Sequence, residues 1–215
     1  KSRAKKIMQK LNITTADFFI TGVGEHKDKK AIPIAFPLFI KPITGGDSRG
    51  IDKNSIIYNY KSFKKKVLEI KKNQHTRCIV EKYLSGKEYS VGIFKDNITD
   101  FIECMPIEII VKKNINGNHI LDFDIKKNDE EKVVAVLDLK IFNELSILAK
   151  KSFIALKGKS FGRIDFKMDH LGKPHFIEAN LMPGIRKGYF YRSCLLNLDI
   201  NYEEMILKIT ANGLH

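Results

Sequence analysis

The sequence predicts an α+β fold built on antiparallel sheets, and three observations support this fold class. Helix-like and strand-like segments follow one another irregularly, unlike the strict strand–helix alternation of a doubly wound parallel sheet. Three strand-like segments are joined by residues 84–87 and 95–97, connections too short for a crossover helix. A further pair of strand-like segments flanks a turn at residues 169–172. We therefore expect antiparallel hairpins.

Periodicity and capping residues place the individual elements. Residues 1–11 are expected to form a helix, because Ile7, Met8 and Leu11 recur on one face. Ser62 can cap a helix that extends to residue 73. The remaining expected elements are strands at 17–21, 37–41, 77–83, 88–94 and 98–104, a long polar loop at 112–131, a helix at 138–156, strands at 161–168 and 175–180, and a helix at 201–210.

The composition is that of a globular protein. The 215 residues, 43% of them hydrophobic and 29% charged, suffice for one or two compact domains. No apolar run approaches the roughly 20 residues of a membrane span, and no apolar core of a signal peptide follows the basic N-terminus. Cys78, Cys104 and Cys194 form no C-x-x-C pair, which argues against a zinc site or a disulfide framework and favours a reducing, cytoplasmic location.

The net charge is positive, because 38 Lys and Arg exceed 25 Asp and Glu by 13. This excess suits a nucleic acid, a membrane surface, a phosphorylated small ligand or simply a solvated lysine-rich surface. The longest basic cluster, residues 64–66, lies in a predicted amphipathic helix, and aromatic and basic residues do not interleave. Neither a nucleic acid nor a membrane is therefore expected as a partner.

The predicted hairpin of residues 161–180 carries the most informative polar residues. Strand side chains alternate between faces, so Arg163 and Asp165 share one face, as do Glu178 and Asn180. A connection with an even number of residues would bring both pairs to the same face, whereas an odd number would separate them. Two facing carboxylates and an amide oxygen suit Mg²⁺. On the hairpin alone, a metal site and a solvated salt-bridged face remain alternatives.

The other face of that hairpin is expected to be core. Ile164 and Phe166 on the first strand, with Ile177 and Ala179 on the second, are apolar residues that alternate with the polar set.

A glycine-rich loop follows the strand that ends at Lys41. Gly45, Gly46 and Gly50 would let backbone N–H groups approach phosphate oxygens, and Lys41 could meet the same charge. The pattern G-x-x-x-x-G-K-[ST] of a P-loop is absent. A phosphate-binding loop and a plain turn therefore both remain open for this segment.

The order of these motifs resembles the ATP-grasp superfamily, and within it the D-alanine–D-alanine ligases. A Lys-Pro-glycine loop is followed by E-K-x-L-x-G-x-E at residues 81–88, and then by R-x-D-F and E-x-N-x-M-P-G at residues 163–166 and 178–184. The resemblance spans nearly the whole chain. It implies two α+β lobes, residues 1–84 and 85–215, whose antiparallel sheets sandwich a nucleotide.

The resemblance implies nucleotide-binding roles for matching residues. Lys1 and Lys41 would bind phosphates, and the loop from Gly45 to Gly50, with Gly46 and Ser48, would close over them. Glu81, Lys82, Tyr83 and Leu84 would frame adenine, and Glu88 would hold the ribose hydroxyl groups.

The resemblance also implies metal-binding and catalytic roles. Asp165, Glu178 and Asn180 would carry two Mg²⁺ ions, with Mn²⁺ as an alternative. Lys126 would meet the γ-phosphate, and Arg163 would stabilise an acyl phosphate and the oxyanion that follows amine attack. The implied function is an ATP- and Mg²⁺-dependent carboxylate–amine ligase of amino-acid or peptide substrates, and a homodimer is allowed. A non-catalytic ATP-binding module is the alternative.

The substrate side departs from the family pattern. Asp47-Ser48-Arg49 stands where the family has small residues. The family's small hydroxyl residues and Ser-Leu pair are replaced by Ile185-Arg186-Lys187-Gly188-Tyr189-Phe190. These departures predict a substrate pair other than two D-alanines, with Arg49, Arg186 and Lys187 favouring a more acidic one. The chain also begins where the central domain of the family begins, which predicts a fragment without the N-terminal domain.

Overall fold

The computed structural model describes residues 1–46, 48–112, 117 and 120–213, and the chain forms two compact units. Unit 1 contains Lys1–Ser2, Ala16–Ser85 and Val111–Glu131, and unit 2 contains Arg3–Thr15, Gly86–Ile110 and Lys132–His215. The predicted domain boundary after residue 84 is one residue from the boundary in the structure, where the chain leaves unit 1 at Ser85 and enters unit 2 at Gly86. The segments 3–15 and 111–131 are, however, assigned to the units opposite to those expected from that division.

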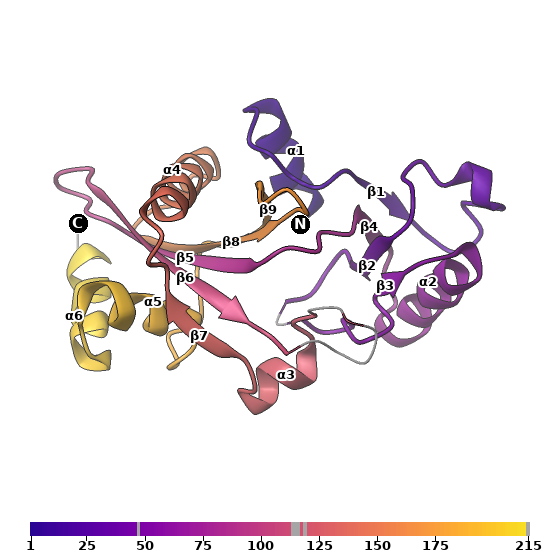
Figure 1. Cartoon of the computed structure of the whole chain (residues 1–215). Coiled ribbons are helices and arrows are strands. Elements are labelled where there is room, and N and C mark those ends of the chain that lie inside the picture. Colours follow the sequence, from indigo (N-terminus) through magenta and orange to yellow (C-terminus); the bar gives the residue numbers. More distant parts are fainter. Residues whose placement is uncertain (47, 113–116, 118–119, 214–215) are drawn as a thin grey trace. The chain divides into compact units, whose positions relative to one another are not determined.

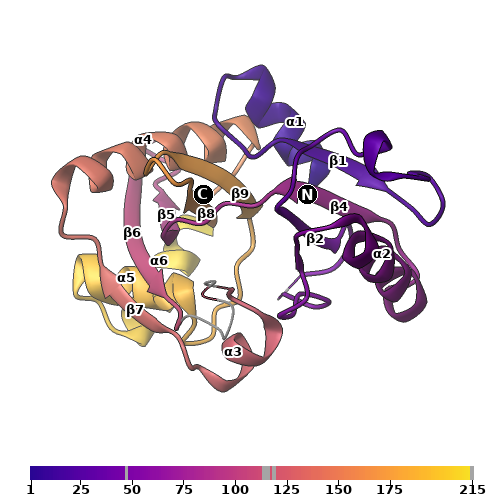
Figure 2. The ribbon, with the colours of Figure 1, turned by 45° about the vertical axis from the view of Figure 1, so that its right-hand side comes forward.

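Unit 1 is built on a four-stranded antiparallel sheet in the order β1-β4-β2-β3. The strands are β1 (Phe18–Thr21), β2 (Leu38–Pro42), β3 (Ile56–Ile57) and β4 (Cys78–Lys82), and the helices are η1 (Lys29–Ala31), α2 (Tyr60–Gln74) and α3 (Phe123–Asn128). Helix α2 lies along this sheet (Figure 2) and buries Phe63, Val67 and Ile70 against Leu38, Ile40 and Val80. Asn59 caps α2, since its side chain accepts the N–H of Ser62, so the helix begins earlier than a Ser62 cap predicts.

Unit 2 is built on a five-stranded antiparallel sheet in the order β7-β6-β5-β8-β9. Its strands are β5 (Glu88–Lys95), β6 (Ile102–Ile110), β7 (Lys132–Ala135), β8 (Phe161–Met168) and β9 (Pro174–Asn180), and its helices are α1 (Ser2–Lys10), α4 (Leu139–Ala155), α5 (Tyr189–Leu198) and α6 (Tyr202–Gly213). Helix α4 covers one face of the sheet, and α5 with α6 covers the other (Figure 1). Both faces of this sheet are therefore partly buried.

The two faces of the unit 2 sheet hold separate cores. Ile164, Phe166 and Phe176 pack with residues of α4 and α1 on one side. Phe94 and Met105 pack with Phe190 and Cys194 of α5 on the other. The site described below occupies polar positions of β5, β8 and β9 between these apolar ones.

The expected α+β class with antiparallel sheets is confirmed, and the differences have local causes. Strand β6 begins at residue 102 instead of 98, because Asp96 accepts the N–H groups of Ile98 and Thr99 and holds them in a turn. Helix α5 was not expected, since Gly188 at its start forms no side-chain cap that a sequence pattern could show. The polar stretch at 112–131 contains α3, while its residues 113–116 and 118–119 lie outside the described residues.

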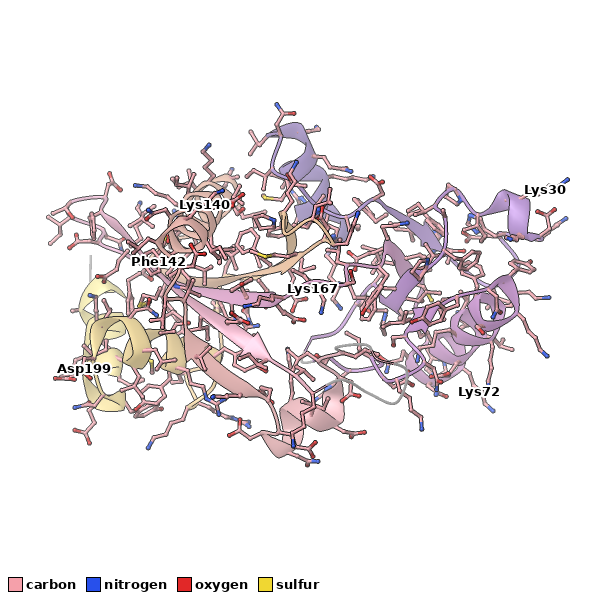
Figure 3. The ribbon with its side chains drawn as sticks, in the orientation of Figure 1. Lys30, Lys72, Lys140, Phe142, Lys167 and Asp199 are labelled. Carbon is pink, nitrogen blue, oxygen red and sulfur yellow. The ribbon has the colours of Figure 1, made fainter. Side chains whose placement is uncertain are left out.

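Surface lysines account for much of the positive charge. Lys30 on η1 and Lys72 on α2 are exposed and reach outward from their elements (Figure 3). Among the described residues, no helix combines the length and the apolar character that crossing a membrane requires.

Candidate functional site

Strands β8 and β9 bring four predicted site residues of unit 2 together. Asp165 lies opposite Glu178, and Arg163 lies opposite Asn180, as predicted for two residue pairs on one polar face. Because residues two apart on a strand share a face, these four side chains belong to one face of the hairpin. The predicted juxtaposition is confirmed; the roles of its members stay predictions.

The register arises in an unexpected way. Met168 pairs with Pro174, so residues 169–173 connect the strands, and this is an odd number. An odd connection alone would set Ile177 opposite Asp165. A β-bulge between Asp165 and Phe166 shifts the pairing by one residue and places Glu178 there instead.

The bulge also corrects one prediction about the core. Phe176 pairs with Phe166 and is fully buried, and it packs with Ile164 and Phe166. Among the described residues, Phe176 and Ala179 are the β9 side chains of this core, and Ile177 is not one of them. The expectation that Ile177 fills the apolar face is therefore wrong, because the inserted residue takes it out of the alternation.

Asp169 organises the turn between the strands. Its Oδ1 accepts the N–H groups of Leu171 and Lys173, both at 2.9 Å, and its Oδ2 lies 3.0 Å from His175 Nε2. Partial burial raises the pKa of Asp169, but the hydrogen bonds from His175 and from the two backbone N–H groups outweigh burial and lower it to about 2. The carboxylate thus stays charged where it holds the turn.

A two-point ion pair fixes the two central side chains. Arg163 Nε donates to Asp165 Oδ1 at 2.9 Å, and Nη2 donates to Oδ2 at 2.8 Å, in the fork geometry of a guanidinium and a carboxylate. Burial lowers the pKa of Arg163, but the charges of Asp165 and Glu178 outweigh burial and raise it. Arg163 is therefore held as a cation beside both carboxylates.

Two further residues of unit 2 complete this cluster and were missed from the sequence. Ser90 of β5 is fully buried, lies opposite Asp165 and donates from Oγ to Asp165 Oδ1 at 2.6 Å. The ring of Tyr189 lies 5.5 Å from Arg163 Cζ, a cation–π distance. Ser90 is two residues after Glu88 on the same strand, so the sequence could have placed both side chains on one face. Only the pairing of β5 with β8 shows that Ser90 meets Asp165.

The donor set of the hairpin fits a hard divalent cation. Two carboxylates and one amide supply only oxygen ligands, which Mg²⁺ prefers, and Arg163 offsets part of their repulsion. Among the described residues, no group of three or more His, Cys, Asp and Glu side chains could hold a metal ion. A metal here would thus need the amide oxygen of Asn180 and ligands from water or substrate.

Glu88, the predicted ribose ligand, begins β5. It lies opposite Lys167 of β8, and Lys167 Nζ is 2.9 Å from Glu88 Oε2. Figure 3 labels Lys167 on its strand. The ion pair holds the carboxylate of Glu88 at the start of the strand that also carries Ser90.

In unit 1, Lys1 meets the glycine-rich loop. Its Nζ donates to the carbonyl oxygens of Gly45 at 2.8 Å and Pro42 at 3.1 Å. Gly45 has φ +83°, a left-handed conformation that favours glycine, and a Cβ added there would meet no atom of the described residues within 4 Å. The structure thus brings the first predicted phosphate lysine to the predicted phosphate loop.

The same loop approaches the segment that precedes α3. Ser48 Oγ donates to the carbonyl oxygen of Leu121 at 3.4 Å. Lys126 lies on α3, which Asp122 caps by accepting the N–H of Ile125. Two segments predicted to cover phosphates are therefore neighbours within unit 1. Asp47 lies outside the described residues.

Lys41 and Glu81 form a buried ion pair at 2.8 Å, with both side chains 4% exposed. They reach each other from β2 and β4, where Lys41 pairs with Ile79 and Phe39 with Glu81. The family resemblance implied a phosphate contact for Lys41 and an adenine contact for Glu81. Their direct contact was not expected, because it depends on the β2–β4 register.

Residues 82–84 follow β4. The N–H of Lys82 donates to Asp17 O at 2.9 Å, and the N–H of Tyr83 donates to Pro37 O at 3.1 Å. Leu84 is buried. These two N–H groups already donate to backbone carbonyl oxygens. The predicted contact with adenine would therefore use the carbonyl oxygens of residues 82–84 and the N–H of Leu84.

This arrangement is shared in sequence with a known protein family. Residues 7–211 match the family model described as D-ala D-ala ligase C-terminus. The chain is 25% identical to D-alanine–D-alanine ligase B of Clostridium perfringens, over all of this chain and 68% of that protein. It is 30% identical to D-alanine–D-alanine ligase of Aquifex aeolicus, over 86% of this chain and 59% of that protein.

Solved structures show the same fold. The D-alanine–D-alanine ligase of Bacillus anthracis complexed with ATP superposes with a TM-score of 0.76 at 21% identity, over 100% of this chain and 65% of that one. The VanG D-Ala:D-Ser ligase of Enterococcus faecalis superposes with a TM-score of 0.76 at 20% identity, over 98% of this chain and 60% of that one. This chain thus spans about two thirds or less of the length of the relatives it matches.

Proposed function

The chain belongs to the family of D-ala D-ala ligase C-termini, and we propose that it is the catalytic part of an ATP- and Mg²⁺-dependent carboxylate–amine ligase. The observation that supports this most is the polar face of β8 and β9, where Asp165 and Glu178 meet beside Arg163 and Asn180. A purely structural face would not require two carboxylates directly opposite one another, since they repel.

The proposed reaction has two steps. A substrate carboxylate oxygen attacks the γ-phosphorus of ATP, the bond to the β,γ-bridging oxygen breaks, and ADP leaves. The amine of a second substrate then attacks the carbonyl carbon of the acyl phosphate. Phosphate departs with the bonding electron pair, the nitrogen loses a proton, and an amide remains. This chemistry depends mainly on positioning and on charge neutralisation.

Residues of unit 2 would neutralise the charge of the reacting groups. Arg163 offers a fixed guanidinium, because Asp165 and the ring of Tyr189 restrain it. Such a preformed donor stabilises an acyl phosphate and the oxyanion formed after amine attack without reorganising during the reaction. Asp165, Glu178 and Asn180 would hold Mg²⁺, two ions in our proposal, with Mn²⁺ able to replace them. Bound there, the metal would withdraw charge from the phosphate oxygens.

Residues of unit 1 would bind the nucleotide. Lys1, Lys41 and Lys126 supply positive charge for phosphates, and the loop with Gly45, Gly46 and Ser48 supplies backbone N–H groups. The segment Glu81, Lys82, Tyr83 and Leu84 would contact adenine, and Glu88 of unit 2 would contact ribose. An ATP-bound ligase among the solved relatives supports this part of the proposal.

The substrates are proposed to be small amino acids or a short peptide. The relatives carry the names of D-alanine ligases, one of them a D-Ala:D-Ser ligase. Arg186 and Lys187 are exposed in the segment before α5, where the family has small hydroxyl residues. We therefore expect at least one substrate that differs from D-alanine and carries an additional negative charge.

Product analysis tests this proposal. The full-length protein would be incubated with ATP, Mg²⁺ and a mixture of D- and L-amino acids, and products would be identified by mass spectrometry. The expected result is an amide formed in equal amount with ADP and phosphate. Binding of Mg-ATP with no turnover across the mixture would instead favour a nucleotide-binding module, and efficient turnover with D-alanine alone would overturn the substrate proposal.

A further inference from the structure

Ser90 is a fully buried polar residue on β5, the central strand of the unit 2 sheet. Its neighbours Tyr89 and Val91 belong to the apolar core that packs against α4. Because side chains alternate along a strand, Ser90 lies on the opposite face, which it shares with Glu88. A buried hydroxyl group costs free energy unless it forms a hydrogen bond, so its partner indicates what a polar residue does at this position.

The partner of Ser90 is the carboxylate of Asp165. Ser90 Oγ donates to Asp165 Oδ1 at 2.6 Å, a distance typical of a charge-assisted O–H···O⁻ bond. Arg163 donates to the same carboxylate, from Nε to Oδ1 at 2.9 Å and from Nη2 to Oδ2 at 2.8 Å. Donors from two different strands, β5 and β8, therefore hold this carboxylate.

The two donors differ in how firmly they hold Asp165. Arg163 lies on β8 itself and reaches Asp165 through a long side chain with many rotamers, so the guanidinium can shift together with the carboxylate. Ser90 reaches Asp165 from the paired strand through a short side chain, and the β5–β8 register sets the two residues directly opposite each other. The hydroxyl of Ser90 therefore ties Oδ1 of Asp165 to the backbone of β5.

Ser90, Asp165 and Glu178 form one row across three neighbouring strands. Ser90 pairs with Asp165 on β8, and Asp165 pairs with Glu178 on β9. The hydrogen bond from Ser90 limits rotation of the Asp165 carboxylate about its side-chain bonds. A cation that binds both carboxylates would thus find that of Asp165 already oriented, which lowers the entropy cost of binding.

We propose that Ser90 is a positioning residue for the metal site. Its hydroxyl holds Oδ1 of Asp165, so that this carboxylate keeps one orientation toward the cation that Asp165 and Glu178 share. Ser90 acts through Asp165 and is not itself a ligand. This inference rests on the proposed function, because that proposal assigns Asp165 and Glu178 to the metal.

Ser90→Ala tests the inference, since it removes the hydroxyl group and keeps the rest of the side chain. Mn²⁺ affinity would be measured in the full-length protein by electron paramagnetic resonance, with a non-hydrolysable ATP analogue present. We expect the affinity to fall by about tenfold, the size found when outer partners of metal ligands are removed. Ser90→Cys should lose as much, because a thiol of similar shape is a weak hydrogen-bond donor.

Ser152→Ala is the matched control. Ser152 is also fully buried in unit 2, and its Oγ donates to Leu148 O at 2.7 Å within α4. This substitution likewise removes a buried hydroxyl and its hydrogen bond, but the bond is made to a helix carbonyl oxygen instead of a carboxylate. Mn²⁺ affinity should therefore stay at the wild-type value.

Double variants separate an action through Asp165 from a general effect on unit 2. Added to Glu178→Gln, Ser90→Ala should lower Mn²⁺ affinity by the same factor as in the wild type. Added to Asp165→Asn it should lower the affinity by much less, because the carboxylate that Ser90 positions is gone. Equal Mn²⁺ affinity in the wild type, Ser90→Ala and Ser90→Cys, or an equal further loss in both double variants, would overturn the inference alone. A wild type that binds no Mn²⁺ with the analogue would overturn the metal site itself, and the inference with it.

Discussion

Asp165 and Glu178 lie directly opposite each other on β8 and β9, although an odd number of residues connects the two strands. The β-bulge beside Asp165 makes this pairing possible. The pairing concentrates two carboxylates next to one guanidinium, and the proposed function depends on what those charges bind.

Removing the charge of Glu178 should affect metal binding more than folding. Glu178→Gln keeps the size of the side chain and leaves the ion pair of Arg163 with Asp165 intact. We expect affinity for Mg²⁺ with ATP to fall at least about tenfold, while the melting temperature stays within a few degrees of the wild type. Isothermal titration calorimetry and thermal unfolding would measure the two effects.

Asp165→Asn provides the contrast to Glu178→Gln. It removes a proposed metal ligand and also the charged partner of Arg163, so both the affinity and the melting temperature should fall. Unchanged nucleotide and metal binding in both variants would contradict the assignment of these residues.

Arg163→Lys should reduce catalysis while the protein still binds ATP. A lysine keeps the charge but cannot form the two parallel hydrogen bonds to Asp165. By comparison with the loss of a single oxyanion donor, we expect kcat to fall about 10²- to 10³-fold. Steady-state kinetics would be compared with Arg77→Lys, which alters an exposed ion pair with Glu25 and should leave kcat unchanged.

The buried pair of Lys41 and Glu81 should separate stability from nucleotide binding. Lys41→Met leaves the carboxylate of Glu81 without this buried ammonium, so the free energy of unfolding should fall by about 3–5 kcal/mol. In Lys41→Met with Glu81→Gln much of that loss should be recovered, because the double variant carries neither charge of this buried pair. Urea unfolding measures the stability. ATP affinity should be reduced in Lys41→Met and should stay reduced in the double variant, because both lack the proposed phosphate lysine. Wild-type ATP affinity in the double variant would argue against phosphate binding by Lys41.

Acidification should weaken the turn that Asp169 holds. The pKa of Asp169 is lowered on folding from 3.8 to about 2, so its contribution to stability is present above pH 4 and is lost as the pH falls through about 2. The wild type should therefore be more stable than Asp169→Asn at pH 5, and the difference should shrink by pH 2. A difference that stayed constant over this range, measured by urea unfolding, would contradict the role of that carboxylate.

Sequence patterns predicted the fold class and most elements, because amphipathic periodicity and tight turns are local signals. They also placed Arg163 and Asp165 on one face and Glu178 and Asn180 on one face. They missed what depends on pairing between distant strands: the contact of Ser90 with Asp165, the pairing of Lys41 with Glu81, and the burial of Lys5. The bulge was also hidden, because Phe176 and Ile177 are both apolar and either could have faced the core.

The most direct test of the central claim follows one oxygen atom. With the substrates identified, the carboxylate substrate would be labelled with ¹⁸O and incubated with ATP, Mg²⁺ and the amine, and the released phosphate would be analysed by mass spectrometry. An acyl phosphate transfers one carboxylate oxygen to phosphate when the amine displaces it, so phosphate carrying one ¹⁸O atom for each amide formed is the predicted result. Phosphate without ¹⁸O, released while the amide forms, would contradict the account.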